Sequence, residues 1–161
     1  MKNARLKVVS GAMADEIKID KEQIINHNKH ILAVSGGNFG VIDLSNLEFA
    51  VDSVNYEVDT IQKATNFLYY MGAGHTFENG NKRIAFEGAK GIMASGGRVV
   101  TANSGEVINF VTGSVAQGKA TKEDVKEWLI LNSKPVNEKP EFNEVTSKNI
   151  EKDKELLKKL D

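Results

Sequence analysis

Small residues run through one apolar segment of the chain and limit how that segment can pack. Between Ile84 and Ser95 the small residues are Ala85, Gly88, Ala89, Gly91 and Ala94. A glycine inside a helix costs about 0.5–1 kcal/mol relative to alanine, so close contact with neighbouring helices has to offset that cost. We therefore expect this segment to form a central helix that other helices approach closely.

Further segments carry apolar residues at helical spacing, and most begin with a capping signal. Asp20 is followed by Gln23, and Thr121 by Asp124, which is the spacing of a capping box at a helix start. Acidic or hydroxyl residues precede the other apolar runs and can cap them in the same way. The helices are predicted to begin after Asp20, Asp43, Asp59, Ser104 and Thr121.

Strand signals are few. Arg5–Val9 and Arg98–Thr101 are the only fair candidates, and both are too short to build a sheet of any size. The glycine-rich stretch Gly36–Gly40 breaks any helix and predicts a loop or a short hairpin. The expected fold class is all-α, a helical bundle with a short flap or hairpin and a charged C-terminal tail.

The length of 161 residues fits one domain. We expect an N-terminal extension over 1–17, a helical domain over 18–136, and a charged tail over 137–161. Because 13 of the 25 tail residues are charged and apolar residues are sparse, the tail is predicted to be a solvated extension that ends in a helix near Leu156.

Composition excludes several classes of function. The chain has no cysteine, so it has no disulfide framework, thiolate nucleophile or cysteine-bound metal. It has no apolar run of about eighteen residues and no secretion signal, so we expect a cytoplasmic protein without a membrane segment. With 21 basic against 22 acidic residues, the chain lacks the basic excess of a protein that binds nucleic acid, so we do not expect nucleic acid as a partner.

The polar stretch from His75 to Arg83 lies between two apolar helices and holds the candidate chemistry. A helix that begins after a turn at Asn79-Gly80 would present free backbone N–H groups to an anion such as phosphate. Lys82 and Arg83 would add positive charge there. His75 is the natural general base, because imidazole exchanges a proton near neutral pH.

These residues resemble a known motif. His75-x-Phe77-x-x-Gly80-Asn81-Lys82-Arg83 is similar to the active-site motif of the Fic/Doc family, most closely its death-on-curing (Doc) branch. The resemblance covers roughly residues 18–136. It implies a Fic/Doc-type helical bundle that transfers part of a nucleoside triphosphate, with ATP as donor, to a hydroxyl of a target protein.

The resemblance also implies roles for single residues. His75 would be the catalytic base and Phe77 would anchor the loop in the core. The phosphate- and nucleotide-binding residues would be Gly80, Asn81, Lys82 and Arg83. Lys82 and Phe86 stand where AMP-transferring members usually carry glycine and a second arginine. Both differences favour phosphoryl transfer, as in Doc, with AMP transfer (AMPylation) as the alternative.

One position departs from the family pattern. Relatives usually have Asp or Glu directly before the glycine, where it holds Mg²⁺, and this chain has Asn79 with Glu78 one place earlier. An amide offers a neutral oxygen, which weakens a site for a hard cation. We therefore expect Mg²⁺ binding at Asn79 to be weak, so that the enzyme either has a weaker metal requirement or is slow.

The resemblance implies partners as well. A Doc-like enzyme would act as the toxin of a toxin–antitoxin pair, with a translation elongation factor as target and a cognate antitoxin as inhibitor. An alternative of another class is a catalytically inactive relative that only binds a protein, and a third is a plain helical adaptor.

Ser147 to Glu151 has the spacing of a Fic self-inhibitory motif, and we interpret this spacing as chance. We interpret His27 and His30 as surface residues.

Overall fold

The computed structural model describes residues 17–160, and this part of the chain is mostly helical, which confirms the all-α class. The helices are α2 (Lys21–Ser35), α3 (Leu44–Tyr56), α4 (Thr60–Gly72), α5 (Asn81–Ser95), α6 (Ser104–Phe110), the π-helical turn η1 (Val111–Val115), α7 (Lys122–Leu131), α8 (Phe142–Lys152) and α9 (Lys154–Lys158). The strands are β2 (Arg98–Val100) and β3 (Ser133–Pro135).

Local capping signals place most helix starts correctly. Asp20 and Thr121 form the predicted capping boxes of α2 and α7, and Asp43 and Asp59 cap α3 and α4. The prediction was wrong for α6, where Asn103 is the cap. The Asn103 side chain accepts a hydrogen bond from the Glu106 N–H, and the Glu106 carboxylate accepts one from the Asn103 N–H. Ser104 is instead the first residue of the helix.

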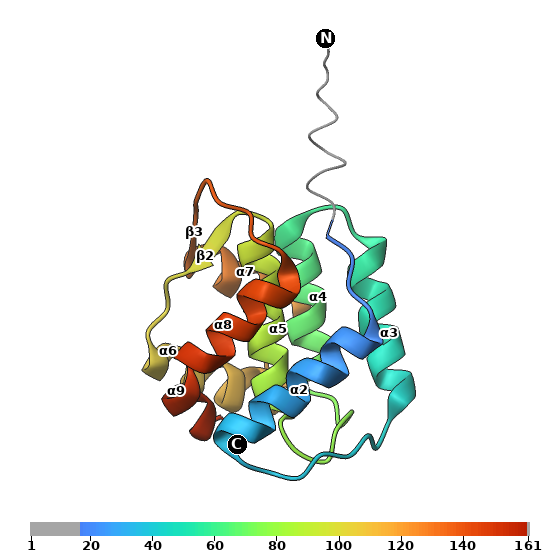
Figure 1. Cartoon of the computed structure of the whole chain (residues 1–161). Coiled ribbons are helices and arrows are strands. Elements are labelled where there is room, and N and C mark those ends of the chain that lie inside the picture. The colour runs from blue at the N-terminus through green and yellow to red at the C-terminus, as the bar shows by residue number, and fades with distance from the viewer. Residues whose placement is uncertain (1–16, 161) are drawn as a thin grey trace.

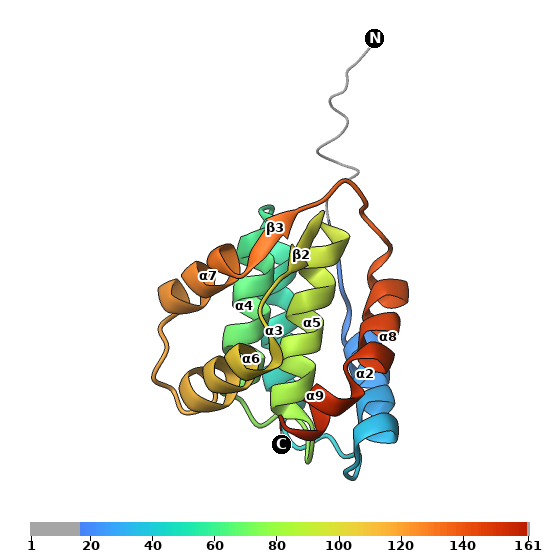
Figure 2. The same cartoon turned by 90° about the vertical axis from the view of Figure 1, so that its left-hand side faces the viewer.

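Helix α5 lies in the middle of the bundle, with α4 beside it and with α2 and α8 across another side (Figures 1 and 2). Its glycines stand where neighbours come closest. A methyl group at Gly88 would collide with the Phe67 ring of α4, and one at Gly91 with the Thr146 hydroxyl of α8. The prediction of a central, closely packed helix is therefore confirmed.

The two strands form a small antiparallel sheet in which Arg98 lies opposite Pro135 and Val100 opposite Ser133. The sequence indicated β2, but its partner was missed, because Ser133–Pro135 contains a proline and has no apolar alternation. The other strand candidate, Arg5–Val9, and most of the expected N-terminal extension lie outside the described residues.

The segment expected to be a solvated tail is packed on the bundle. It contains α8 and α9, and its apolar residues Phe142, Ile150 and Leu157 are buried against the core. The Lys90 ammonium of α5 pairs with the Asp153 carboxylate at 2.8 Å, with both side chains largely covered. A few apolar residues at helical spacing are enough to hold this segment against the bundle, although about half of its residues are charged.

His27 also differs from its expected surface position. It is buried, bonds through Nε2 to Asn143 Oδ1 at 2.9 Å, and meets the Phe142 ring edge-to-face. Burial lowers the pKa of this imidazole. His27 is thus part of the seam between α2 and α8.

No helix within residues 17–160 is both long and apolar enough to cross a membrane.

Candidate functional site

Two loops meet at one end of the bundle, at the bottom of the view in Figure 1, where α9 also ends. The loop after α2 pairs with the loop between α4 and α5 through backbone groups. The Ile42 N–H donates to the Thr76 carbonyl at 2.7 Å, and the Glu78 N–H donates to the Gly40 carbonyl at 2.8 Å. Val41 and Phe77 form an isolated antiparallel bridge. The flap predicted near Gly36–Gly40 is thus bound to the loop that carries the motif.

The amide of Asn81 holds that second loop in shape. Its Nδ2 donates to the Phe77 carbonyl at 2.8 Å, and its Oδ1 accepts from the Phe77 N–H at 2.9 Å. The Phe77 ring is 1% exposed and lies in the core. Asn81, the first residue of α5, therefore clamps the loop to the helix that follows it.

Gly80 precedes α5 in a left-handed conformation, with φ of 89°. A Cβ at this position would stand 2.6 Å from Asn28 Oδ1 of α2. Both the backbone conformation and the close approach of α2 therefore favour glycine. As the N-cap, Gly80 makes no side-chain hydrogen bond to the start of α5, where the positive end of the helix dipole lies.

A pocket of about 220 Å³ opens at this helix start. Its lining is polar except for one side chain, and consists of His75, Glu78, Asn79, Gly80, Asn81, Lys82 and Leu160. His75 is exposed, and Lys82 contributes an ammonium. An imidazole and a cation around one hollow at a helix start can bind an anion and act as a general base beside it.

The structure brings together His75, Gly80, Asn81 and Lys82, but it places Arg83 elsewhere. Arg83 is 2% exposed, and its Nη1 donates to Ser35 Oγ at 2.6 Å and to the Gly36 carbonyl at 2.8 Å. It does not belong to the pocket lining. In this arrangement Arg83 fastens the end of α2 to α5.

The residues around Asn79 do not fit a resident Mg²⁺ ion. Asn79 Oδ1 accepts a hydrogen bond from the Asn38 N–H at 2.7 Å, so the flap already uses the oxygen that would face a cation. Glu78 supplies one carboxylate to the pocket lining, and within residues 17–160 no group of three or more acidic or histidine side chains is placed to hold a metal. A hard cation prefers several such oxygens.

Several residues that build the site were missed by the sequence analysis. Asn46 Nδ2 donates to Thr76 Oγ1 at 2.8 Å and ties α3 to the loop. Asn38 and Asn28 contact Asn79, and Leu160 closes one side of the pocket. Asparagine is common in loops of any kind, so nothing in the sequence distinguished these residues.

Glu151, which has the spacing of a self-inhibitory glutamate, bonds to other residues. Its carboxylate bonds to His30 Nε2 at 2.5 Å and to the Lys154 ammonium at 3.2 Å. These contacts lower the pKa of Glu151, the His30 bond most. Glu151 thus links α8 to α2 and α9.

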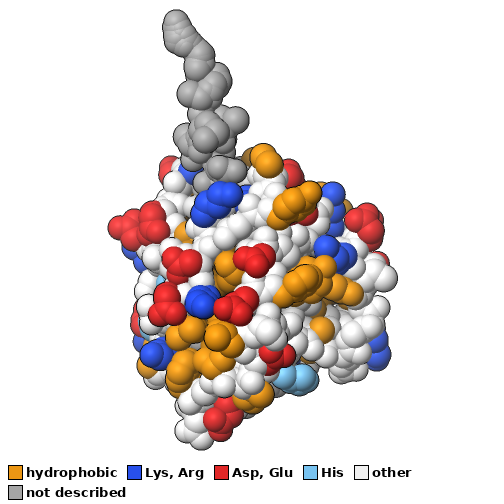
Figure 3. Space-filling model, turned by 90° about the vertical axis from the view of Figure 1, so that its right-hand side faces the viewer, with side chains coloured by type: hydrophobic (Ala, Val, Ile, Leu, Met, Phe, Trp, Pro, Cys, Tyr) orange, Lys and Arg blue, Asp and Glu red, His pale blue; other side chains and the backbone are white. Residues whose placement is uncertain are grey.

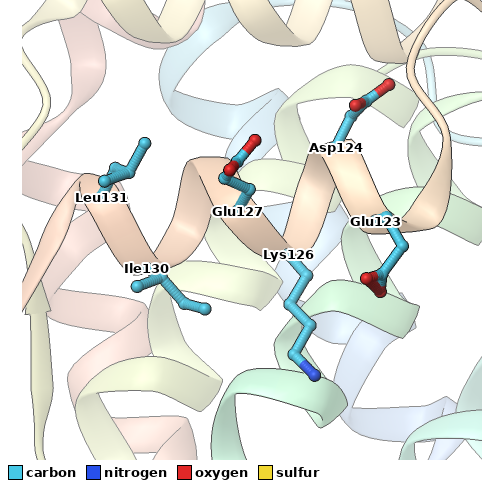
Figure 4. Close-up of a pocket in the computed structure, with 6 residues that line it drawn as sticks. All are labelled: Glu123, Asp124, Lys126, Glu127, Ile130 and Leu131. Carbon is cyan, nitrogen blue, oxygen red and sulfur yellow. The ribbon is translucent and has the colours of Figure 1, made fainter.

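A larger hollow lies on α7, but it is not enclosed. Figure 4 shows that its lining side chains all project from this one helix. They are Glu123, Asp124, Lys126, Glu127, Ile130 and Leu131. A ligand there would meet one wall only, so the pocket at the start of α5 remains the candidate site.

Comparison with models of protein families finds no match for this chain, and comparison with curated proteins finds none either.

Proposed function

We propose that this chain is a Fic/Doc-type domain that transfers the terminal phosphoryl group of ATP to a hydroxyl of a target protein. One observation carries the proposal: the pocket at the start of α5, the positive end of the helix dipole, is lined by the exposed His75 and by Lys82. Phosphoryl transfer needs a positioned base and positive groups that stabilise charge on the phosphates.

In the proposed step, His75 removes the proton of the target hydroxyl. The hydroxyl oxygen forms a bond to the γ-phosphorus, and the bond between that phosphorus and the β–γ bridging oxygen breaks. ADP leaves with the bonding electron pair. The N–H groups of α5 and the Lys82 ammonium stabilise the charge that grows on the leaving phosphates.

Phosphoryl transfer is favoured over AMP transfer by the residue at position 86. Position 86, where AMP-transferring relatives carry a second arginine, is a buried phenylalanine here. The expected partners are a translation elongation factor as target and a cognate antitoxin, in a cytoplasmic setting.

Incubation with labelled ATP tests the proposal. The purified protein is mixed with elongation factors and with ATP labelled on the γ- or the α-phosphate. We expect γ-label on a protein band with the wild type and none with His75→Ala, because that variant lacks the base. Lys82→Ala should weaken ATP binding by roughly ten- to 150-fold, since a hydrogen bond to a charged group contributes about 1.5–3 kcal/mol, and Lys126→Ala on α7 is the control.

The outcomes separate the alternatives. Transfer of α-label would indicate AMP transfer. Transfer that survives His75→Ala would reject His75 as the base, and the absence of ATP binding in calorimetry would reject the proposal as a whole.

A second candidate function is a catalytically inactive Fic/Doc-like module that binds a protein. The inward position of Arg83 favours it, because the guanidinium is bonded to Ser35 and Gly36 rather than lining the pocket. The amide oxygen of Asn79 is likewise used by the flap. Protein binding without transfer of either label would support this candidate.

A further inference from the structure

Exposed hydrophobic side chains concentrate in one stretch of the chain. Of the ten large hydrophobic residues exposed within residues 17–160, seven lie between residues 39 and 58: Phe39, Val41, Ile42, Leu44, Phe49, Tyr56 and Val58. Tyr56 is 86% exposed and Val58 74%. Single exposed apolar residues are ordinary, but a concentration of them marks an interaction site.

The same stretch is strongly acidic. Between residues 41 and 62 there are five acidic residues and no lysine or arginine: Asp43, Glu48, Asp52, Glu57 and Asp59. Glu48 pairs with Lys21 of α2 at 3.0 Å, in an ion pair whose two side chains are nearly half exposed. Exposed pairs of this kind exchange easily, because they contribute only about 0–1 kcal/mol. We call the exposed side chains of Ile42, Leu44, Glu48, Phe49, Asp52, Tyr56 and Val58 the α3 face.

Three of these side chains, those of Phe49, Asp52 and Tyr56, share one side of α3. Phe49, Asp52 and Tyr56 follow at intervals of three and four residues, which places them in a row along the helix. Phe49 also meets the Tyr70 ring of α4 edge-to-face, with 4.8 Å between ring centroids. Figure 3 views the molecule from the side on which α3 lies and shows hydrophobic patches beside acidic side chains there.

The α3 face begins at the candidate site. At the start of α3, the Asp43 N–H donates to the Thr76 carbonyl at 3.1 Å, and the Asn46 side chain bonds to the Thr76 hydroxyl. Thr76 directly follows His75 in the chain. A protein segment lying along α3 would therefore have one end beside the pocket.

We propose that the α3 face binds an amphipathic, basic segment of a partner protein. Its apolar side chains would cover Phe49 and Tyr56, and its lysines or arginines would face the acidic residues of this stretch. A 13-residue helix is about 20 Å long, so the matching partner segment is three to four helical turns. This proposal does not depend on the chemistry proposed at His75.

A second copy of the chain fits this face less well. A two-fold symmetric contact sets the same surface against itself, and here it would bring acidic residues of both copies together without a cation from the stretch itself. Helix α7 is also a poorer candidate. It exposes only Ile130 and Leu131 as large hydrophobic residues, and Lys126 lies among its acidic side chains (Figure 4). Lys122 adds a second positive charge to this helix.

Two model peptides test the proposal with the whole chain and without nucleotide. Both are 14-residue amphipathic helices with the same leucine face, and their polar positions are lysine in one and glutamate in the other. Titration into ¹⁵N-labelled protein should shift backbone amide signals of residues 42–58 with the lysine peptide, at an affinity at least tenfold higher than that of the glutamate peptide. Signals that move on α7 instead, or equal affinity of the two peptides, would overturn the proposal.

Variants localise the binding. Phe49→Ser with Tyr56→Ser should weaken the lysine peptide at least tenfold, and so should Asp52→Lys, while circular dichroism checks that each variant is folded. Ile130→Ser with Leu131→Ser is the matched control and should leave the affinity unchanged. A dimer in sedimentation velocity that Phe49→Ser dissociates would assign the face to a second copy and contradict a heterologous partner. No outcome depends on label transfer, so this test and that of the proposed function fail separately.

Discussion

At the scale of single residues, Gly80 fixes how closely α2 approaches the start of α5. Its left-handed backbone and the nearby Asn28 oxygen each oppose a side chain. Gly118 offers a matched comparison, because it has φ of 71° but nothing within 4 Å of an added Cβ. The two glycines separate the cost of conformation from the cost of contact.

Gly118→Ala should therefore lower the free energy of unfolding by about 1–2 kcal/mol, the cost of a left-handed alanine. Gly80→Ala should lower it by more, because Asn28 must also move. Urea denaturation of both variants measures the difference. Equal losses would mean that the contact with Asn28 has no energetic weight.

The residues of the candidate site could be predicted where they lie close together in the sequence. His75, Gly80, Asn81 and Lys82 stand together in the sequence, and the structure brings them to one pocket. Arg83 is their neighbour in the chain, yet its guanidinium turns to Ser35 and Gly36, far away in sequence. The neighbouring sequence does not indicate which hydrogen-bond partners the Arg83 guanidinium takes, so its position could not be predicted.

At the scale of elements, the C-terminal helices are part of the bundle. Ile150 of α8 is fully buried, although the segment around it is highly charged. Capping boxes gave the starts of α2 and α7 because they are local. The packing of α8 depends on α2 and α5, which are distant in sequence, and for that reason it was missed.

Ile150→Ala should lower the free energy of unfolding by about 2–5 kcal/mol, as for other buried isoleucines. Leu131→Ala, at a side chain that is 74% exposed, is the control and should change it by less than about 0.5 kcal/mol. Chemical denaturation of both variants checks this. A small loss at Ile150 would show that α8 detaches before the bundle unfolds.

At the scale of the whole molecule, one buried carboxyl makes stability depend on pH. Glu87 of α5 is buried, and burial is the main cause that raises the pKa of its carboxyl well above the ordinary 4.5. The neighbouring Asp153 carboxylate raises this pKa further, while Lys90 opposes the shift. The folded state then keeps a proton that the unfolded chain has lost. Stability falls as pH rises from about 4.5 toward the raised pKa.

Glu87→Gln removes this titration and keeps the shape of the side chain. Thermal or urea unfolding between pH 4 and 8 should show a decline in the wild type that the variant lacks, at most about 1.4 kcal/mol per pH unit. Parallel curves for the two proteins would show that Glu87 ionises alike in both states.

The flap and the motif loop are joined at Ile42–Thr76 and Glu78–Gly40 by main-chain amides. Main-chain hydrogen bonds of this kind do not depend on which side chains the two loops carry. Substitution of outward-facing side chains of the flap should therefore leave the pairing of the two loops intact, so that the surface beside His75 can change while the fold beneath it is kept.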